Sequence, residues 1–444
     1  MKKYKPFFFQ FLSLLVLLSF TKQLYAQDST VALQLNDLIA QSTANNKNIQ
    51  LAKMDEQIAA SGYKETLAIL LPQVGFSYSA FTTNNPLNAF GFKLQQKSIS
   101  ASDFNPAILN NPSATPDFMT QLNVQQPLVN MDMLYMRKSA LKQTELYQYK
   151  TQRTKEQIIY QSQQAYLQLQ MAYDAHNVLQ EALQTAKAMY KFTNDRYVQG
   201  LLQKSDLLNV EVQIKTIETN LADVKSNISN ASDYISLLMN KQTGVVYTVE
   251  SFAISNDNGL AVDTLSANRA DFKAMETAIE SYDMAIKSSK MSYMPKLNAF
   301  ANYQLHDKAM LGFGAGAYLA GIQLSWDIFK GNATKNKIAT QTLERNKMSE
   351  ELNNQKDESR VELNKTYRQF TDAVFKMQQQ QTAVDQANEA LRILQNRYQQ
   401  GLVNTTDVLM AQTQLSQQKL AYTQAVFSKN ISLAYLQFLT ATNQ

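Results

Sequence analysis

Few residues in this chain have the types and spacing that catalysis or metal binding requires. Histidine occurs twice, at His176 and His306, about 130 residues apart, and cysteine does not occur. Two isolated imidazoles do not form the clustered ligand set of a zinc site. Without cysteine there are no disulfides, thiol nucleophiles, thiolate metal ligands or lipid-modified N-terminal cysteine. No nucleophile or phosphate-loop signature occurs either, so we expect no enzyme, no catalytic residue, no metal and no cofactor.

The charge and the first residues indicate an exported protein. The formal net charge is +5, but residues 1–26 hold four lysines and no acid, which leaves 38 basic and 37 acidic residues. A nearly neutral mature chain argues against nucleic acid as a partner. The lysines precede an apolar run from Phe7 to Phe20, and Ala26 offers a small residue for cleavage, which predicts a signal peptide. The alternative is a membrane anchor, for which about 14 apolar residues are few.

Two stretches without glycine or proline predict unusually long helices. They extend from Leu128 to Gln199 and from Asn332 to Gln400. As helices, stretches of this length would each be roughly 100 Å long. Apolar residues in the second stretch alternate at intervals of three and four, which is typical of coiled-coil packing: Leu363, Tyr367, Phe370, Val374 and Met377. An ordinary amphipathic helix has the same spacing and differs only in length.

The sequence also repeats itself. Residues 196–208 and 397–409 are identical at seven of 13 positions, at an offset of 201. Each copy has an isolated glycine, Gly200 or Gly401, which ends a helix by adopting a left-handed conformation. We therefore expect two helix hairpins, each with a long helix, a tight turn and a return helix of about 35 residues.

The residues around each turn fit helix ends. Arg196 and Arg397 would lie in the last turn of a helix, where a cation complements the helix dipole. The expected caps of the return helices are Ser205 in the first hairpin and Thr405 or Thr406 in the second.

Four shorter stretches alternate apolar and polar residues, as strands with two unlike faces do. The apolar positions are Val74, Phe76, Tyr78 and Ala80; Leu122 and Val124; Leu297, Ala299, Ala301, Tyr303 and Leu305; and Ala320, Ile322, Leu324, Trp326 and Ile328. We expect one strand hairpin at about 72–128 and another at about 295–329. In an exported chain this fits transmembrane strands, apolar towards lipid and polar towards a lumen, although a soluble sandwich would alternate in the same way.

Four strands are too few to close a barrel. Unpaired strand edges are not tolerated in lipid, and single-chain barrels begin at about eight strands. Several copies must therefore share one barrel. We expect residues 81–118 to form a long surface loop and residues 306–317 a short connection.

The predicted organisation has four parts. A signal peptide covers residues 1–26. The first repeat covers residues 27–240, with its tip at 197–205. A linker or equatorial segment, which includes a candidate short strand at Val245–Val249, covers residues 241–264. The second repeat covers residues 265–444, with its tip at 398–406.

Together these features resemble the TolC-like outer membrane efflux proteins. The resemblance rests on Pro295 before a strand, on Leu324–Gly331 at a strand-to-helix junction, on the Tyr-x-x-Gly-Leu tips, and on the order and duplication of the elements. It covers essentially the whole mature chain. It implies a mainly α fold with transmembrane β: long antiparallel coiled-coil α-hairpins plus four β-strands per chain. A homotrimer would then form a twelve-stranded outer membrane barrel and an α-helical periplasmic tunnel.

The resemblance also implies a role and partners. The family serves as the passive exit duct of tripartite efflux or type I secretion systems, in outer membrane lipid, with a periplasmic adaptor (membrane fusion) protein and an inner-membrane transporter. The adaptor-docking tips correspond to Gly200, Leu201, Leu202, Gly401, Leu402 and Val403.

At the tunnel entrance the resemblance implies a constriction. Asp407 matches the first acid of a pair that narrows the tunnel in some members, but Met410 occupies the second position, which puts a two-acid gate in doubt. Tyr398 matches a position of closed-state contacts. Plainer interpretations remain open, in which the glycines only end helices, Asp407 complements a helix dipole and Tyr398 packs in a core.

A second hypothesis is an exported structural or adhesive coiled-coil surface protein without channel activity. It accounts for export and long helices, but it does not account for duplicated strand hairpins.

Overall fold

The computed structural model describes residues 30–251 and 264–440. The predicted signal peptide and residues 252–263 of the predicted linker lie outside them. The chain forms two compact units. The first comprises the described residues within Met1–Gln50, Thr154–Ser266 and Ser359–Gln444, and the second comprises Leu51–Arg153 and Ala267–Glu358. Each compact unit contains residues from both predicted repeats. The repeats at residues 27–240 and 265–444 therefore describe a predicted duplication of the sequence and do not correspond to the two compact units.

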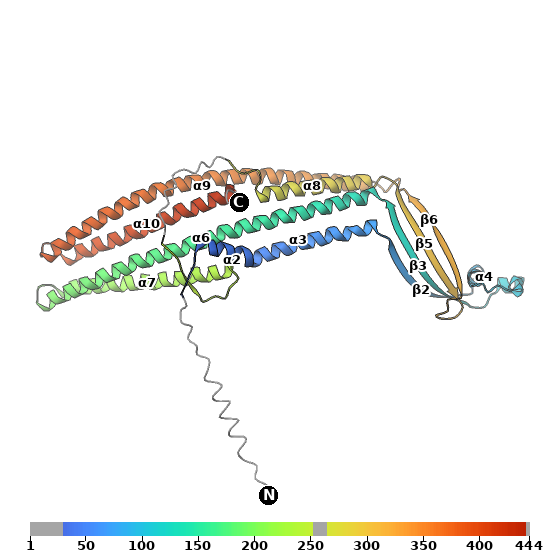
Figure 1. The fold of residues 1–444 in the computed structure, drawn as a ribbon, viewed down its shortest axis with the longest axis horizontal. Coiled ribbons are helices and arrows are strands. Elements are labelled where there is room, and N and C mark those ends of the chain that lie inside the picture. Colours follow the sequence, from blue (N-terminus) through green and yellow to red (C-terminus); the bar gives the residue numbers. More distant parts are fainter. Residues whose placement is uncertain (1–29, 252–263, 441–444) are drawn as a thin grey trace, which may run out of the picture. The chain divides into compact units, whose positions relative to one another are not determined.

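The elements follow one another as helix, strand hairpin, long helix and return helix, twice (Figure 1). The first series is β1 (Thr30–Ala32), α2 (Leu35–Asn45), α3 (Lys47–Glu65), η1 (Thr66–Leu70), β2 (Gln73–Thr83), α4 (Pro86–Gln95), η2 (Ala101–Phe104), α5 (Pro106–Asn110), β3 (Thr115–Val129), α6 (Met131–Val198), α7 (Lys204–Leu238) and β4 (Val246–Thr248). The second is α8 (Ala270–Met291), β5 (Lys296–Asp307), β6 (Ala315–Ser325), α9 (Ala333–Gln399) and α10 (Thr405–Thr440).

The long helices confirm the prediction from glycine and proline. Helices α6 and α9 have 68 and 67 residues, and the return helices α7 and α10 have 35 and 36. Most of the predicted apolar stripe of α9 packs inward, with Leu363 buried and Phe370 beside it in one cluster. Tyr367 is an exception, because nearly half of its side chain is exposed.

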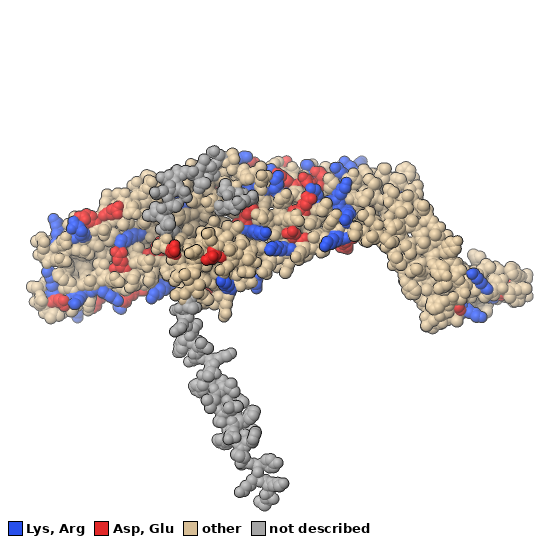
Figure 2. Space-filling model, in the orientation of Figure 1, with Lys and Arg blue, Asp and Glu red and all other residues tan. Residues whose placement is uncertain are grey.

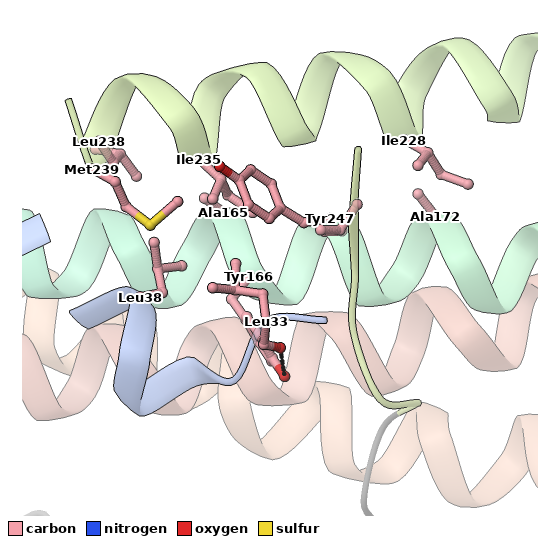
Figure 3. Packing of buried hydrophobic residues seen from close by; sticks show 11 residues of the cluster. Leu33, Leu38, Ala165, Tyr166, Ala172, Ile228, Ile235, Leu238, Met239 and Tyr247 are labelled. Carbon is pink, nitrogen blue, oxygen red and sulfur yellow. Dashed lines mark hydrogen bonds between the residues drawn. The ribbon is translucent and has the colours of Figure 1, made fainter. Parts of the chain in front are cut away.

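The first unit is held together where α2, α6, α7 and β4 meet. Figure 3 shows Leu38 of α2, Tyr166 of α6, Ile235 of α7 and Tyr247 of β4 in one buried cluster. The Tyr166 hydroxyl donates to the Leu33 carbonyl at 3.4 Å. Strand β4 pairs in parallel with β1, from Thr30↔Val246 to Ala32↔Thr248. β4 is the predicted short strand, whereas β1 was not predicted.

The second unit contains the sheet, with strand order β2-β3-β5-β6 and antiparallel neighbours throughout. The two predicted hairpins are joined edge to edge, because β3 of the first pairs with β5 of the second, as in Leu122↔Tyr303. The four strands lie side by side in Figure 1. Strands β2 and β6 each have one partner among the described residues, so each leaves one edge open.

The prediction of a long surface loop at residues 81–118 is wrong, because much of this segment is helical. The segment contains α4, η2 and α5, which with their connections form a helical insertion (residues 84–114) between β2 and β3. Both α-helices begin with Asn-Pro: the Asn85 side chain accepts from the Asn88 amide, and Asn105 accepts from the Ala107 amide. Asparagine as the N-cap with proline in the first turn is a favourable helix start.

Candidate functional site

The four strands form a sheet with two chemically different faces. Because the register pairs Phe76 with Leu122, Leu122 with Tyr303 and Tyr303 with Tyr318, the apolar side chains of all four strands lie on one face. This apolar face also carries Val74, Val124, Ala301, Ile322 and Leu324. Most of its large side chains are exposed in the single chain. An exposed apolar surface of this extent needs a non-aqueous neighbour.

The opposite face, the polar face, is lined mainly by amides and hydroxyls. It carries Ser77, Ser79, Gln121, Asn123, Asn302, Gln304 and Gln323. Neighbouring side chains interact across strands, since the Gln304 amide donates to the Gln121 side chain at 3.3 Å. Glycine makes room on this face: a Cβ on Gly75 would lie 2.5 Å from the Asn123 side chain, and one on Gly321 would lie 3.1 Å from the Phe300 ring.

Charge is nearly absent from the strands. Only Asp117, Lys296 and Asp307 carry it, each near a strand end. Figure 2 shows a sheet surface without red or blue, whereas the helices carry both colours. At the junction after β6, Trp326, Ile328 and Phe329 are exposed, and the Trp326 indole donates to the Tyr293 carbonyl at 2.9 Å. Aromatic residues such as Trp326 and Phe329 are typical of a membrane–water interface.

The two hairpin tips have the same backbone geometry. Gly200 and Gly401 have φ of +77° and +75°. In the first tip the Gly200 and Leu201 amides donate to the Tyr197 and Arg196 carbonyls, both at 2.9 Å, and the second tip repeats this pattern. This is the Schellman arrangement, which satisfies the last carbonyls of a helix.

Apolar side chains are presented at both tips. Leu201 is 67% exposed and Leu402 is 68% exposed. Leu202 and Val403 are half-buried. The residue after the glycine often packs back on its own helix in a Schellman motif, but these leucines remain in solvent.

The return helices are capped one or two residues earlier than predicted. The Asp407 carboxylate accepts from the Asn404 amide at 3.2 Å, and the Asn404 side chain accepts from the Asp407 amide at 2.9 Å. In the first tip Asp206 accepts from the Gln203 amide at 3.1 Å. Asn404 and Gln203 therefore take the places expected for Thr405 or Thr406 and for Ser205. Asp407 lies near the second tip and has a local structural role.

Tyr398 is only 5% exposed and lies between helices. Its hydroxyl is 2.9 Å from the Thr405 hydroxyl of α10 and 3.2 Å from the Thr193 hydroxyl of α6. Its ring is 5.2 Å from that of Phe192. In the single chain this side chain thus packs where the two hairpins meet.

Arg196 joins the two tips, which was not predicted. Its guanidinium donates to the Gln399 carbonyl of α9 at 3.0 Å and lies over the Phe192 ring at 4.5 Å. From the sequence, Arg196 is expected only to complement the dipole of its own helix. A contact between two hairpins has no characteristic spacing in the sequence, so it cannot be predicted there.

A groove of about 870 Å³ lies beside the first tip, between α6 and α7. Leu208 and Val212 expose apolar side chains in it, and Glu211 and Tyr190 line it as well. A hydrogen bond with the Glu211 carboxylate raises the pKa of Tyr190, so the phenol remains a neutral donor.

Two other features are absent from residues 30–251 and 264–440. No group of three or more acids or histidines there is arranged to hold a metal ion. No helix there combines the length and the apolar character needed to cross a bilayer.

Comparisons with known proteins agree with this geometry. The family model described as outer membrane efflux protein matches residues 38–241 and 261–442. No curated protein matches the chain. Among solved structures, CusC has a TM-score of 0.77 at 16% identity, with 94% of each chain covered.

Two further channels have the same fold. The CmeC outer membrane channel of Campylobacter jejuni has a TM-score of 0.75 at 16% identity, over 91% of this chain and 85% of its own. VceC of Vibrio cholerae has a TM-score of 0.72 at 17% identity, over 91% of this chain and 95% of its own. The matched family and the fold, with its duplicated hairpins and two-faced sheet, confirm the resemblance: the chain belongs to the outer membrane efflux protein family.

Proposed function

We propose that this outer membrane protein is the exit duct of a tripartite efflux or type I secretion system. Three copies share a twelve-stranded barrel, and their hairpins form a periplasmic tunnel. Substrates pass from an inner-membrane transporter and a periplasmic adaptor to the outside without any bond being made or broken. The family is one of efflux channels, not of enzymes.

The observation that carries this proposal is the sheet with unlike faces and open edges. The apolar face suits lipid, and the polar face, with its uncharged amides, suits a water-filled lumen. The open edges of β2 and β6 present unpaired backbone groups, which lipid does not satisfy. Pairing β6 of one copy with β2 of the next satisfies both edges and closes the barrel.

Adaptor docking at the tips has separate support. Leu201 and Leu402 are exposed apolar side chains on hydrogen-bonded Schellman turns, and the groove at Leu208 and Val212 continues the apolar surface of the first hairpin. We assign docking to Gly200, Leu201, Leu202, Gly401, Leu402 and Val403. Asp407 and Tyr398 lie close to the second tip, and we place the tunnel-entrance constriction there, with adaptor contacts shifting its population from closed to open.

Channel formation is tested with the purified mature protein in detergent. We expect a trimer by mass and discrete conductance steps in a planar bilayer. A monomer that is soluble without detergent would contradict the proposal. Trimers without any conductance would favour the structural or adhesive surface protein instead.

Docking is tested with the double variant Leu201→Asp, Leu402→Asp. The charged side chains should abolish docking of the adaptor. On a native gel, the complex extracted from membranes should then run at the size of the free trimer, while the bilayer conductance of the trimer is unchanged. The matched control is Ser226→Asp, at an exposed position of α7 distant from the tip. An unchanged assembly in the double variant would exclude docking through these leucines.

A further inference from the structure

One end of the polar face is covered by the chain itself. Thr115, Asp117, His306 and Ala315 all lie on this face, at the strand ends next to the helical insertion, and they are between 1% and 7% exposed. Pro116, adjacent on the apolar face, is exposed. The apolar face is covered less completely at this end, because Pro116 is open although Thr120 is 7% exposed.

Helix α4 of the insertion covers the part of this end that β2 and β3 form. The Phe92 ring of α4 lies 6.1 Å from the ring of Phe81, which is on the polar face opposite Asp117. Gln96, just after α4, donates to the Asp117 carboxylate at 2.9 Å and to the Pro116 carbonyl at 2.8 Å. The other Asp117 oxygen is 2.8 Å from Nδ1 of His306. Asp117 thus links the insertion to two strands.

The insertion is a built unit with its own internal contacts. Lys93 and Asp103 form an ion pair at 2.7 Å. The Asp103 carboxylate also accepts from the Ser100 amide at 2.7 Å, and the Phe90 and Phe104 rings meet edge-on at 5.7 Å. Ala89 of α4 is almost fully buried. These contacts hold the insertion together, while Phe92 and Gln96 attach it to the polar face.

We infer that the helical insertion narrows the outer mouth of the channel, a conclusion that rests on the proposed lumen. If the polar face lines the lumen, α4 lies on the lumen side of the barrel wall. It does so at the strand ends opposite those that join the long helices, because the chain enters β2 from α3 and leaves β3 into α6. Three copies would place three insertions around one opening. Gln96 and Asp117 form the latch that holds each of them there.

The test uses access of thiol reagents to the lumen. The chain has no cysteine, so a single introduced thiol is the only one present. Ser77→Cys places it on the polar face, between the insertion and the helical end of β2. A small cationic methanethiosulfonate and a bulky polyethylene-glycol maleimide are added separately to intact cells. A shortened variant replaces residues 84–114 with an Asn-Gly turn, a favoured hairpin connection.

We expect the small reagent to label Ser77→Cys in both proteins. The bulky reagent should label it about tenfold faster in the shortened variant, and Gln96→Ala should give a smaller increase because it loses the hydrogen bonds of the latch. Ser98→Cys, exposed on the insertion itself, is the control and should react with both reagents in the full-length protein. If the shortened variant does not reach the outer membrane, Gln96→Ala decides.

Equal rates of bulky labelling at Ser77→Cys in the full-length protein and in both variants would overturn the constriction while leaving the channel intact. Failure of the proposed function itself would be seen differently. The small reagent would then leave Ser77→Cys unlabelled, and the purified protein would give no bilayer conductance.

Discussion

At the tips, backbone conformation selects glycine. Gly200 and Gly401 have positive φ, and a Cβ added at either would meet no atom within 4 Å. The constraint is thus the left-handed conformation and not lack of space. We expect Gly200→Ala to destabilise its tip by about 1 kcal/mol, seen as faster amide hydrogen exchange in residues 196–205.

Gly62 is the matched control for this prediction. It also has open space around its Cβ position, but it lies inside α3 and its φ is not positive. Gly62→Ala should stabilise α3 by about 1 kcal/mol, because alanine has the higher helix propensity. Equal effects at both glycines would mean that the tip turn does not depend on the left-handed conformation.

Asp103 provides a pH-dependent contact in the helical insertion. Hydrogen bonds from Lys93 and then from Ser100 lower its pKa from 3.8 to about 2. Because the folded-state pKa is lower than the unfolded one, the stabilisation is complete above about pH 4 and is lost as pH falls through about 2. We expect the protection factors of the amides in residues 93–104, which are corrected for the intrinsic pH dependence of exchange, to fall over that interval. Lys93→Met should reduce this acid dependence, and identical protection of the wild type at pH 5 and pH 2 would contradict the assignment.

At the scale of elements, the two faces of the sheet predict opposite responses to charge. Phe76 and Ser77 are neighbours in β2 but lie on the apolar and polar face, respectively. An arginine facing lipid near the membrane centre costs about 2–4 kcal/mol. Phe76→Arg should therefore lower the yield of trimer in the outer membrane, as measured on unheated gels.

Ser77→Arg is the paired variant for the same measurement. It should assemble normally and shift the reversal potential of the channel towards anions in a salt gradient, because the added charge faces the lumen. If both variants assembled equally well, the apolar face would not be in lipid.

The long helices could be predicted from the sequence, whereas the short helices of the insertion could not. Long helices leave a strong signal, because glycine and proline are rarely both absent over about 70 residues unless those residues are helical. Short elements leave a weak one. Asn85-Pro86 and Asn105-Pro106 suggest turns as readily as helix starts, and β1 has only three residues.

Contacts between distant segments could not be predicted at the candidate site. The sequence indicates a left-handed glycine at Gly200 and at Gly401, because that requirement is local. It does not indicate that Arg196 reaches Gln399, or that Asp117 joins Gln96 to His306. Those contacts depend on how the hairpins and strands pack, and no short-range spacing encodes them.

At the scale of the whole molecule, the open edges of β2 and β6 predict how copies join. Phe76→Cys in β2 can be combined with one cysteine at Tyr318, Ala320, Ile322 or Leu324 in β6, all on the apolar face. One of these registers should give disulfide-linked dimers and trimers on non-reducing gels and no larger species.

Phe76→Cys with Gln323→Cys is the control, because these side chains lie on opposite faces and cannot meet across paired strands. A ladder that extends beyond three copies, or no cross-link in any of the four registers, would argue against a closed trimer.

The pairing of β1 with β4 bears on the order of events during secretion. Thr30 crosses the inner membrane early, but its partner Val246 lies more than 200 residues further along. The same delay applies to β3, since it needs β5 as well as β2. Closing such long loops is slow, so β1 and one edge of β3 stay unpaired until the later strands arrive. We therefore expect newly translocated chains to need periplasmic chaperones until nearly all of the polypeptide has crossed the inner membrane.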